Sequence, residues 1–367
     1  MIRVEDVLAA VDRLAPFRQA EEWDNVGLIL GGADRPVRRV LAALDASDAV
    51  AAEAERLRAD CLVVHHPLIF HGIKRLTADT RTGRVALRLL AGKRSLIVAH
   101  TNLDGAAGGL CDILGRMVGL ENLEPLQHPP PQSRYKIVVF VPGDSAEAVR
   151  AAAFAAGAGR IGNYTECSFS VEGEGTFLPG ERARPAVGKR GRRNAVREHR
   201  LEVLVEEGRL GAVLAAIARA HPYEEPAIDT YPLKAVAPGA GVGRIGRLRR
   251  PMSAGRFAAV AKRALGLKAV GLSGDPKRPV ERVAICTGAG GGVLAAVRAA
   301  RAQAFLTGEL AMHELQELEA FGVATVLGGH YQTERIPMNA WVPRLVRALK
   351  GVEVRLSRAE RAPSRPV

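Results

Sequence analysis

The sequence predicts an α/β protein with a split core domain, built on a mixed sheet, and an inserted ferredoxin-like (βαββαβ) α+β domain. The first 125 residues alternate between apolar strand-like segments and amphipathic helices, which is typical of a sheet covered by helices on both faces. Three consecutive prolines at residues 129–131 indicate a stiff connector, and the alternation resumes from residue 239. The length of 367 residues also favours two domains.

In the first part of the chain, the apolar spacing predicts three helices and three strands. Ser47 stands where a helix N-cap is expected. The helices are predicted at residues 4–16, 47–59 and 80–93, and the strands at residues 38–46, 61–66 and 95–104.

The middle of the chain follows a β-α-β-β-α-β order, the ferredoxin-like pattern. Residues 163–179 fit two strands around a turn. We therefore expect a discontinuous core at residues 1–128 and 238–367, and an inserted domain at residues 133–234.

In the last part of the chain, strands and helices alternate again. Strands are expected at residues 280–286, 303–309 and 323–330, and helices at residues 293–302, 310–322 and 333–350.

Composition limits the class of protein. The net charge is +13, but only residues 181–200 are densely basic, and without aromatic residues they are more typical of a solvated loop than of a nucleic-acid surface. The four cysteines form no C-x-x-C pair, which argues against a zinc knuckle or a disulfide scaffold. No apolar run approaches the roughly 20 residues of a membrane helix, and the N-terminus lacks secretory features. We expect a cytoplasmic protein with no membrane partner.

Histidine and carboxylate side chains follow strands in both halves of the core. Ligand sites in α/β sheets lie just beyond the carboxyl ends of strands. Side chains four residues apart on a helix share a face, so such a pair could reach one ion. The residues concerned are His65, His66, His100, Asp104, His330 and Glu334.

Neutral imidazole and carboxylate are ligands of zinc, iron and manganese. Five such side chains exceed what one catalytic zinc takes from a protein. A pair of ions about 3.5–4 Å apart uses them naturally, and His65 and His66 could then each face a different ion. Spacing alone leaves open a second interpretation, in which these are surface or hydrogen-bonded histidines.

Six longer motifs carry a resemblance to a known family. They are EEWDNVGLILG (21–31), LVVHHPLIFHGIKRL (62–76), AHTNLDGAAGGLCDIL (99–114), AICTGAGGG (284–292), AFLTGELAMHE (304–314) and GGHYQTERI (328–336). In this order they resemble the Nif-three-like dinuclear metal-centre proteins, also known as GTP cyclohydrolase I type 2 homologues. The similarity covers residues 1–125 and 240–365, and the insert resembles the middle domain of the longer bacterial members.

The resemblance implies a site and an assembly. Two divalent ions (zinc, iron or manganese) would be held by His65, His66, Asp104, His330 and Glu334, and His100 would support them or add a further ligand. The family resemblance also implies a toroidal homohexamer whose metal sites face an internal cavity.

Further candidates carry two interpretations each. Asp24 and Asn25 lie near the metal pocket by resemblance, or are turn and cap residues. Glu309 and His313 either line the cavity or are ordinary helix-surface residues.

A glycine-rich stretch and a motif of the insert complete the candidates. The amides of Gly288, Gly290 and Gly291 either bind a substrate phosphate or form a tight β-α turn. HPYEEP, residues 221–226, is expected to shape the fold of the insert or a lid.

The expected function is hydrolysis of a nucleotide-like substrate. By resemblance this is GTP, with opening of the purine imidazole ring and release of formate. No side chain is assigned as the nucleophile, because a metal-bound hydroxide would attack. The alternatives are a metal-dependent phosphoesterase and a non-enzymatic, hexameric metal-binding scaffold or chaperone that binds a regulatory partner.

Overall fold

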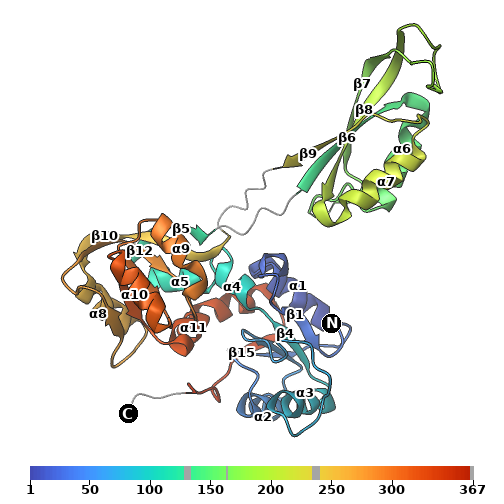
Figure 1. The fold of residues 1–367 in the computed structure, drawn as a ribbon. Helices are drawn as coiled ribbons and strands as arrows, with labels where there is room; N and C mark the ends of the chain where they lie inside the picture. The colour runs from blue at the N-terminus through green and yellow to red at the C-terminus, as the bar shows by residue number, and fades with distance from the viewer. Residues whose placement is uncertain (128–133, 163, 234–239, 364–367) are drawn as a thin grey trace. The chain divides into compact units, whose positions relative to one another are not determined.

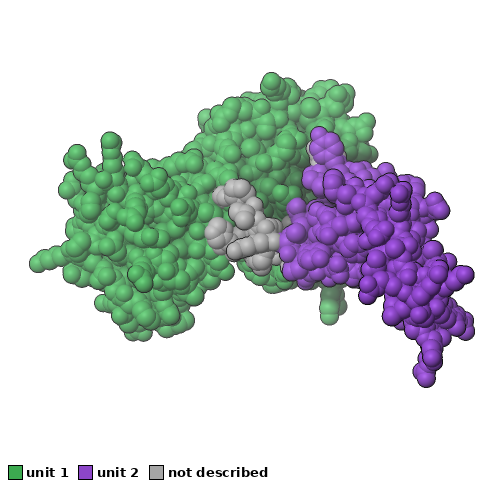
Figure 2. All heavy atoms as spheres, turned by 90° about the horizontal axis from the view of Figure 1, so that it is seen from above, with its two compact units in different colours: residues 1–129, 238–367 green, residues 130–237 purple. Residues whose placement is uncertain are grey.

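The computed structural model describes residues 1–127, 134–162, 164–233 and 240–363. The chain forms two compact units, residues 1–129 with 238–367 and residues 130–237 (Figure 2). The three prolines at residues 129–131 lie outside the described residues. No helix within the described residues is long and apolar enough to cross a membrane.

The first sheet of the larger unit has five strands in the order β1-β4-β3-β2-β15. All are parallel except β1, which pairs antiparallel with β4. Val40 and Val63 enter one apolar core, and their neighbours Leu41 and Leu62 enter another on the opposite face. The strands are β1 (Gly27–Leu30), β2 (Arg39–Ala43), β3 (Cys61–Val64), β4 (Ser95–Val98) and β15 (Glu353–Leu356).

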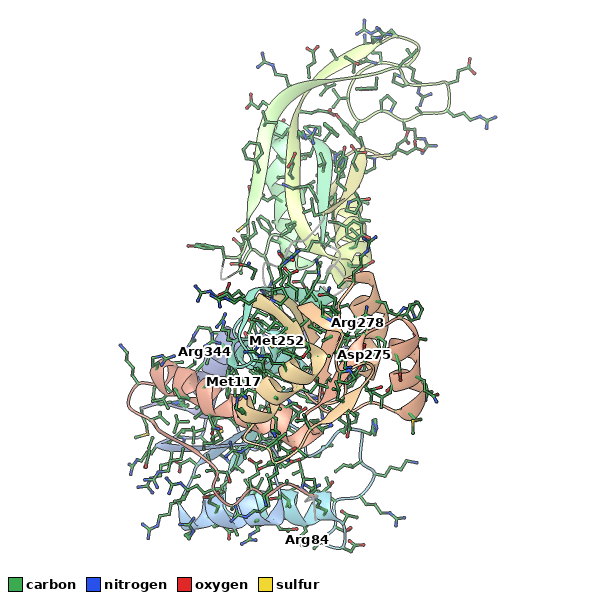
Figure 3. The ribbon with its side chains drawn as sticks, turned by 90° about the vertical axis from the view of Figure 1, so that its left-hand side faces the viewer. Arg84, Met117, Met252, Asp275, Arg278 and Arg344 are labelled. Atoms are coloured by element: carbon green, nitrogen blue, oxygen red, sulfur yellow. The ribbon has the colours of Figure 1, made fainter. Side chains whose placement is uncertain are left out.

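Helices cover both faces of this sheet. α2 and α3 pack on the Leu41 face, and α1 packs on the other. Ser47 caps α2 by accepting a hydrogen bond from the amide of Val50, as predicted. Arg84 of α3, which Figure 3 labels, pairs with Asp48 of α2 at 2.9 Å. The helices of this part are α1 (Val4–Leu14), α2 (Asp48–Arg56), α3 (Arg81–Ala91), α4 (Thr101–Gly105) and α5 (Leu110–Met117).

The second sheet has six strands in the order β11-β14-β13-β12-β10-β5. Its three central strands are parallel and the outer strands are antiparallel to their neighbours. The strands are β5 (Leu120–Gln127), β10 (Val242–Ser253), β11 (Gly271–Ser273), β12 (Pro279–Ile285), β13 (Ala304–Thr307) and β14 (Ala324–Leu327). The helices are α8 (Ala254–Ala264), α9 (Leu294–Ala299), α10 (Met312–Ala320) and α11 (His330–Ala348).

The larger unit therefore has two mixed sheets, where the sequence predicts one. Apolar alternation marks strands and helices, but it does not specify which strands pair. Within the described residues, β15 is the one strand that returns from the C-terminal part to the first sheet. α11 begins after β14 and connects the two sheets (Figure 1). Its Trp341 and Leu345 are buried in the first sheet's core.

The smaller unit has one antiparallel sheet in the order β7-β8-β6-β9, with two helices packed on it. The two strands expected at residues 163–179 are wrong, because a single strand, β7, pairs with β8 along its whole length. The elements in chain order are β6 (Arg134–Pro142), α6 (Ala146–Ala155), β7 (Ser168–Phe177), β8 (Asn194–Glu206), α7 (Leu210–Ala220) and β9 (Ile228–Leu233).

Candidate metal centre

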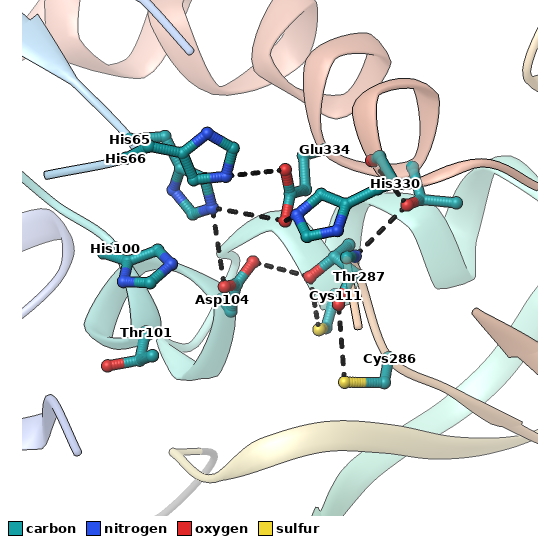
Figure 4. Close-up of polar contacts among 12 residues, drawn as sticks. His65, His66, His100, Thr101, Asp104, Cys111, Cys286, Thr287, His330 and Glu334 are labelled. Atoms are coloured by element: carbon teal, nitrogen blue, oxygen red, sulfur yellow. Dashed lines mark hydrogen bonds and ion pairs between the residues drawn. The ribbon is translucent and has the colours of Figure 1, made fainter. Parts of the chain in front are cut away.

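His65 and His66 leave β3 on the same side, although neighbouring residues of a strand point to opposite faces. β3 ends at Val64, and the chain bends at the two histidines. Their ring centroids lie 5.0 Å apart (Figure 4). The bend lets both imidazoles face one space.

Side chains from two other strand ends reach the same space. His100 follows β4, and Asp104 lies in the short helix α4 behind it. His330 is the first residue of α11 and Glu334 lies one turn later, so their side chains share a helix face. The six predicted histidine and carboxylate residues thus converge from both sheets of the larger unit (Figure 4).

Glu334 lies among three of the imidazoles. Its Oε2 is 3.0 Å from Nε2 of His66, and its Oε1 is 3.1 Å from Nε2 of His330 and 3.7 Å from Nε2 of His65. Asp104 Oδ2 lies 3.5 Å from Nε2 of His65. One buried carboxylate therefore contacts histidines from both sheets.

All four histidines use Nδ1 for a hydrogen bond away from the shared space. The partners are acceptors only, so in the neutral form of each ring Nδ1 carries the proton and Nε2 keeps a lone pair. The pairs are His65 with the carbonyl of Ala99 (2.9 Å), His66 with Asp45 (3.2 Å), His100 with Asp24 (2.9 Å) and His330 with Glu309 (2.9 Å).

Nε2 of His65 is buried and has no hydrogen-bond partner among the described residues. A buried polar atom without a partner costs free energy, so such atoms are rare. Carbonyl or carboxylate support behind a histidine, with the other ring nitrogen open, is the arrangement of metal-binding histidines.

The charges in the cluster are strongly coupled. Burial opposes ionisation of Glu334, but the imidazoles of His330, His65 and His66 hold its pKa well below the ordinary value. Burial lowers the pKa of His66, yet Asp45 and Glu334 outweigh it and raise that pKa to about 10. Contact with Glu334 raises the pKa of His330 to about 9. The carboxylates therefore favour positive charge in this space.

The donor set fits divalent metal ions. Two groups of three side chains offer ligand atoms that all lie within 4.8 Å of one another: His65, His66 and His100, and His66, His330 and Glu334. His66 belongs to both groups. Imidazole and carboxylate suit zinc, iron and manganese alike, so the donor set does not select one metal.

Thr287 supports Asp104 and is a residue that sequence reasoning missed. Its Oγ1 donates to Asp104 Oδ1 at 2.5 Å and lies 3.2 Å from the sulfur of Cys111. Thr287 follows β12, and Asp45 follows β2. The strand-end rule that selected the histidines could have selected both residues.

The other predicted residues have different surroundings. Asp24 supports His100 and also accepts from Thr101. Asn25 donates from its side-chain amide to the carbonyl of Ile69 at 2.6 Å. Glu309 contacts His330, whereas His313 is exposed in the first turn of α10.

Gly288 is placed where a larger residue would strike the cluster. Its φ is +63°, and a Cβ would lie 2.2 Å from Oε1 of Glu334. The amides of Gly288 and Gly290 donate to Oγ1 of Thr333 and the carbonyl of Glu309. Two of the three amides proposed for phosphate thus have partners within the chain.

Two exposed aromatic rings lie beside the cluster. Trp23 is 57% exposed and Phe70 is 38% exposed, with ring centroids 5.7 Å apart. The ring of His100 lies 6.2 Å from Trp23 and 6.4 Å from Phe70. An apolar, aromatic surface therefore adjoins the histidines.

The chain that carries this histidine cluster is similar to known proteins. Residues 2–363 match the family model described as Duf34/NIF3 (NGG1p interacting factor 3). The chain belongs to the Duf34/NIF3 family. A Mycobacterium tuberculosis protein named GTP cyclohydrolase 1 type 2 homolog is 42% identical to this chain, over 91% of this chain and 88% of the length of the relative. A Bacillus subtilis protein of the same name is 34% identical, over 89% of this chain and 88% of the length of that relative.

Solved structures agree with the fold over the whole chain. A Bacillus cereus protein related to NIF3 is 33% identical, with a TM-score of 0.71 and coverage of 100% of this chain and 99% of that one. A Staphylococcus aureus protein is 26% identical, with a TM-score of 0.78 and the same coverage. The NIF3-like fold, a mixed α/β protein with three sheets, is thereby confirmed.

Proposed function

We propose that this member of the Duf34/NIF3 family is a metal-dependent hydrolase with two divalent ions in the histidine cluster. The observation that carries the proposal is the shared orientation of four imidazoles. Each has Nδ1 held by an oxygen acceptor, and their Nε2 atoms are turned toward one space that also contains the carboxylates of Asp104 and Glu334.

The proposed ligands are His65, His66, Asp104, His330 and Glu334, with His100 as a sixth. The two carboxylate oxygens of Glu334 face imidazoles of both groups, whereas His66 would offer its single Nε2 lone pair to one ion, because Asp45 holds its Nδ1. Asp24, Asp45 and Glu309 orient imidazoles, and Thr287 orients Asp104. The ions, when bound, would supply Lewis acidity and lower the pKa of a water molecule.

The proposed substrate is nucleotide-like, with a planar ring next to the metal centre. The exposed pair Trp23 and Phe70 supports this, because base stacking on aromatic side chains is favourable and tolerant of base identity. The name carried by the Mycobacterium and Bacillus relatives points toward GTP. Opening of the purine imidazole ring is the reaction that this name suggests.

Two further properties are part of the proposal. We infer a homohexamer from the family, with the metal centres facing an internal space. We also assign the insert to the ferredoxin-like class, which its element order and antiparallel sheet support.

Turnover tests the proposal against its alternatives. The protein, loaded separately with zinc, iron or manganese, is incubated with GTP, other nucleotides and phosphate esters, and formate and phosphate are measured. Formate release that is lost in Glu334→Gln supports the hydrolase, whereas phosphate release alone indicates a phosphoesterase. Stoichiometric metal binding without turnover of any compound would favour the scaffold.

A further inference from the structure

The insert contains a cavity of about 420 Å³ that none of the metal-centre chemistry uses. It lies at the end of β7, under the loop of residues 178–187, beside the motif HPYEEP. Pockets of about 300–1,000 Å³ are typical of small-molecule sites. The size is therefore that of a site for a metabolite rather than for a single ion.

A buried carboxylate lines this cavity. Glu198 of β8 is only 9% exposed, and its Oε1 accepts a hydrogen bond from the hydroxyl of Tyr223 at 2.9 Å. Among the described residues, Glu198 forms no ion pair, and the basic residue Arg184 also lines the cavity. A buried carboxylate is costly unless a cation or several hydrogen bonds compensate its charge. Tyr223 donates a hydrogen bond to Glu198, and within the described part of the chain no cation pairs with the charge of this carboxylate.

Gly175 creates the space for this carboxylate. It lies on β7, and a Cβ at that position would be 2.1 Å from Oε2 of Glu198. Any side chain there would displace Glu198 from the cavity. The absence of a side chain at Gly175 of β7 therefore leaves room for the carboxylate of Glu198.

The motif HPYEEP fixes the wall opposite. Nε2 of His221 donates to the carbonyl of Phe140 at 2.9 Å, and the amide of Tyr223 donates to Nδ1 of the same histidine at 3.1 Å. Glu224 accepts from the amide of Arg184 at 2.7 Å, which holds the covering loop. His221, Tyr223 and Glu224 of the motif thus each have a part in building this cavity.

Aromatic rings supply part of the remaining walls, together with apolar residues of the covering loop and the charged residues Arg184, Glu224 and Glu225. Phe140, Phe177 and Tyr223 line the cavity, and the rings of Phe177 and Tyr223 lie 6.5 Å apart. A carboxylate combined with aromatic faces is the recognition chemistry of organic cations. A metal ion fits poorly, because it needs several oxygen or nitrogen ligands, and the metal-ligand groups found among the described residues do not include Glu198.

We propose that this cavity binds a small organic cation, an alkylammonium or guanidinium group on an aromatic or aliphatic body. Glu198 pairs with the cation, and Phe140, Phe177 and Tyr223 contact its apolar body. The proposal is independent of the metal centre and of its chemistry.

Calorimetric titration of the full chain, treated with a chelator, tests the proposal. The probes are benzylamine and agmatine, with benzyl alcohol as the neutral isostere of benzylamine. We expect saturable 1:1 binding of both amines. Benzyl alcohol should bind at least about tenfold more weakly than benzylamine, because the ion pair is lost. Glu198→Gln should weaken benzylamine binding by about tenfold or more. Glu174→Gln, an exposed acid of β7, removes the same charge and should bind as wild type does.

Three outcomes would overturn the proposal. They are no saturable binding of either amine, equal affinity for benzylamine and benzyl alcohol, or unchanged affinity in Glu198→Gln. The comparison of amine with alcohol uses wild-type protein alone. It therefore decides the matter even where the Glu198 variant folds poorly.

Discussion

Nδ1 of His66 lies 3.2 Å from Oδ1 of Asp45, which follows the end of the neighbouring strand β2. The contact fixes the ring so that Nε2 faces Glu334. Asp45 contributes no atom to the proposed ligand set, yet it determines which nitrogen of His66 is available. The proposed metal centre thus depends on residues that are themselves not proposed as ligands.

Replacing Asp45 should therefore weaken metal binding without removing a ligand. We expect Asp45→Asn to lower the affinity for zinc by about 10–100-fold, the usual effect of losing such support. Competition with a chromophoric chelator measures the affinity. Asp48→Asn, which removes a surface acid paired with Arg84, is the matched control and should not differ from wild type. Equal affinities in both variants would contradict the role of Asp45.

Gly288 should be intolerant of any side chain. Gly288→Ala places a Cβ 2.2 Å from Oε1 of Glu334. It also holds an alanine at a φ of +63°, in the left-handed region that residues with a side chain rarely adopt. We expect a loss of stability of roughly 2 kcal/mol or more, together with weakened metal binding. Gly292→Ala in the same loop meets no atom within 4 Å and should be nearly neutral. Thermal unfolding compares the two, and equal melting temperatures would refute this explanation.

Glu53 should make stability depend on pH far from the cluster. Burial opposes its ionisation, but hydrogen bonds from Ser357 and the amides of Ala359 and Arg358 outweigh it and lower its pKa below the ordinary value of 4.5. A lowered folded-state pKa means that the stabilisation is complete above about pH 4.5 and is lost as the pH falls through the folded-state value.

Glu53→Gln should consequently be less stable than wild type at pH 7, by about 1–3 kcal/mol. The difference should shrink once the pH falls below about 4.5, the unfolded-state value. Denaturant unfolding at pH 7, 5 and 3.5 measures it. A difference that stays constant over this range would show that the charge of Glu53 contributes nothing.

Trp23 should affect substrate binding rather than the metal. With a nucleotide substrate, Trp23→Leu should raise KM by about 5-fold or more, because base stacking contributes about 1–3 kcal/mol. Metal content should stay unchanged. Phe169→Leu, an exposed aromatic residue of the insert, serves as the control. An unchanged KM in Trp23→Leu would remove the support for a planar substrate.

The positions of His65, His66, His330 and Glu334 were predictable because each follows an apolar strand, and strand ends in α/β proteins gather at one place. Of the supporting residues, Asp24 and Glu309 were among the candidates, whereas Asp45 and Thr287 were not. Asp45 and Thr287 are single polar residues at strand ends, without a neighbouring histidine to draw attention to them. Only the fold shows that they contact proposed ligands.

The sequence pattern did not predict the two-sheet architecture, for a different reason. The strands β2 and β12 have similar apolar character, and nothing in either specifies its neighbours. The pairing of β15 with β2 joins residues more than 300 positions apart, Arg39 and Glu353. Such a contact depends on the packing of the whole unit and not on local spacing.

Metal content per chain, determined by plasma mass spectrometry, tests the central claim most directly. Wild-type protein, His66→Ala and Glu334→Ala are reconstituted with zinc, iron or manganese and freed of excess metal, with Glu174→Gln as the control. We predict about two ions per chain in wild type and in the control, and substantial loss in both cluster variants. Wild-type protein that retains no metal after reconstitution, or cluster variants that retain two ions per chain, would contradict the dinuclear centre.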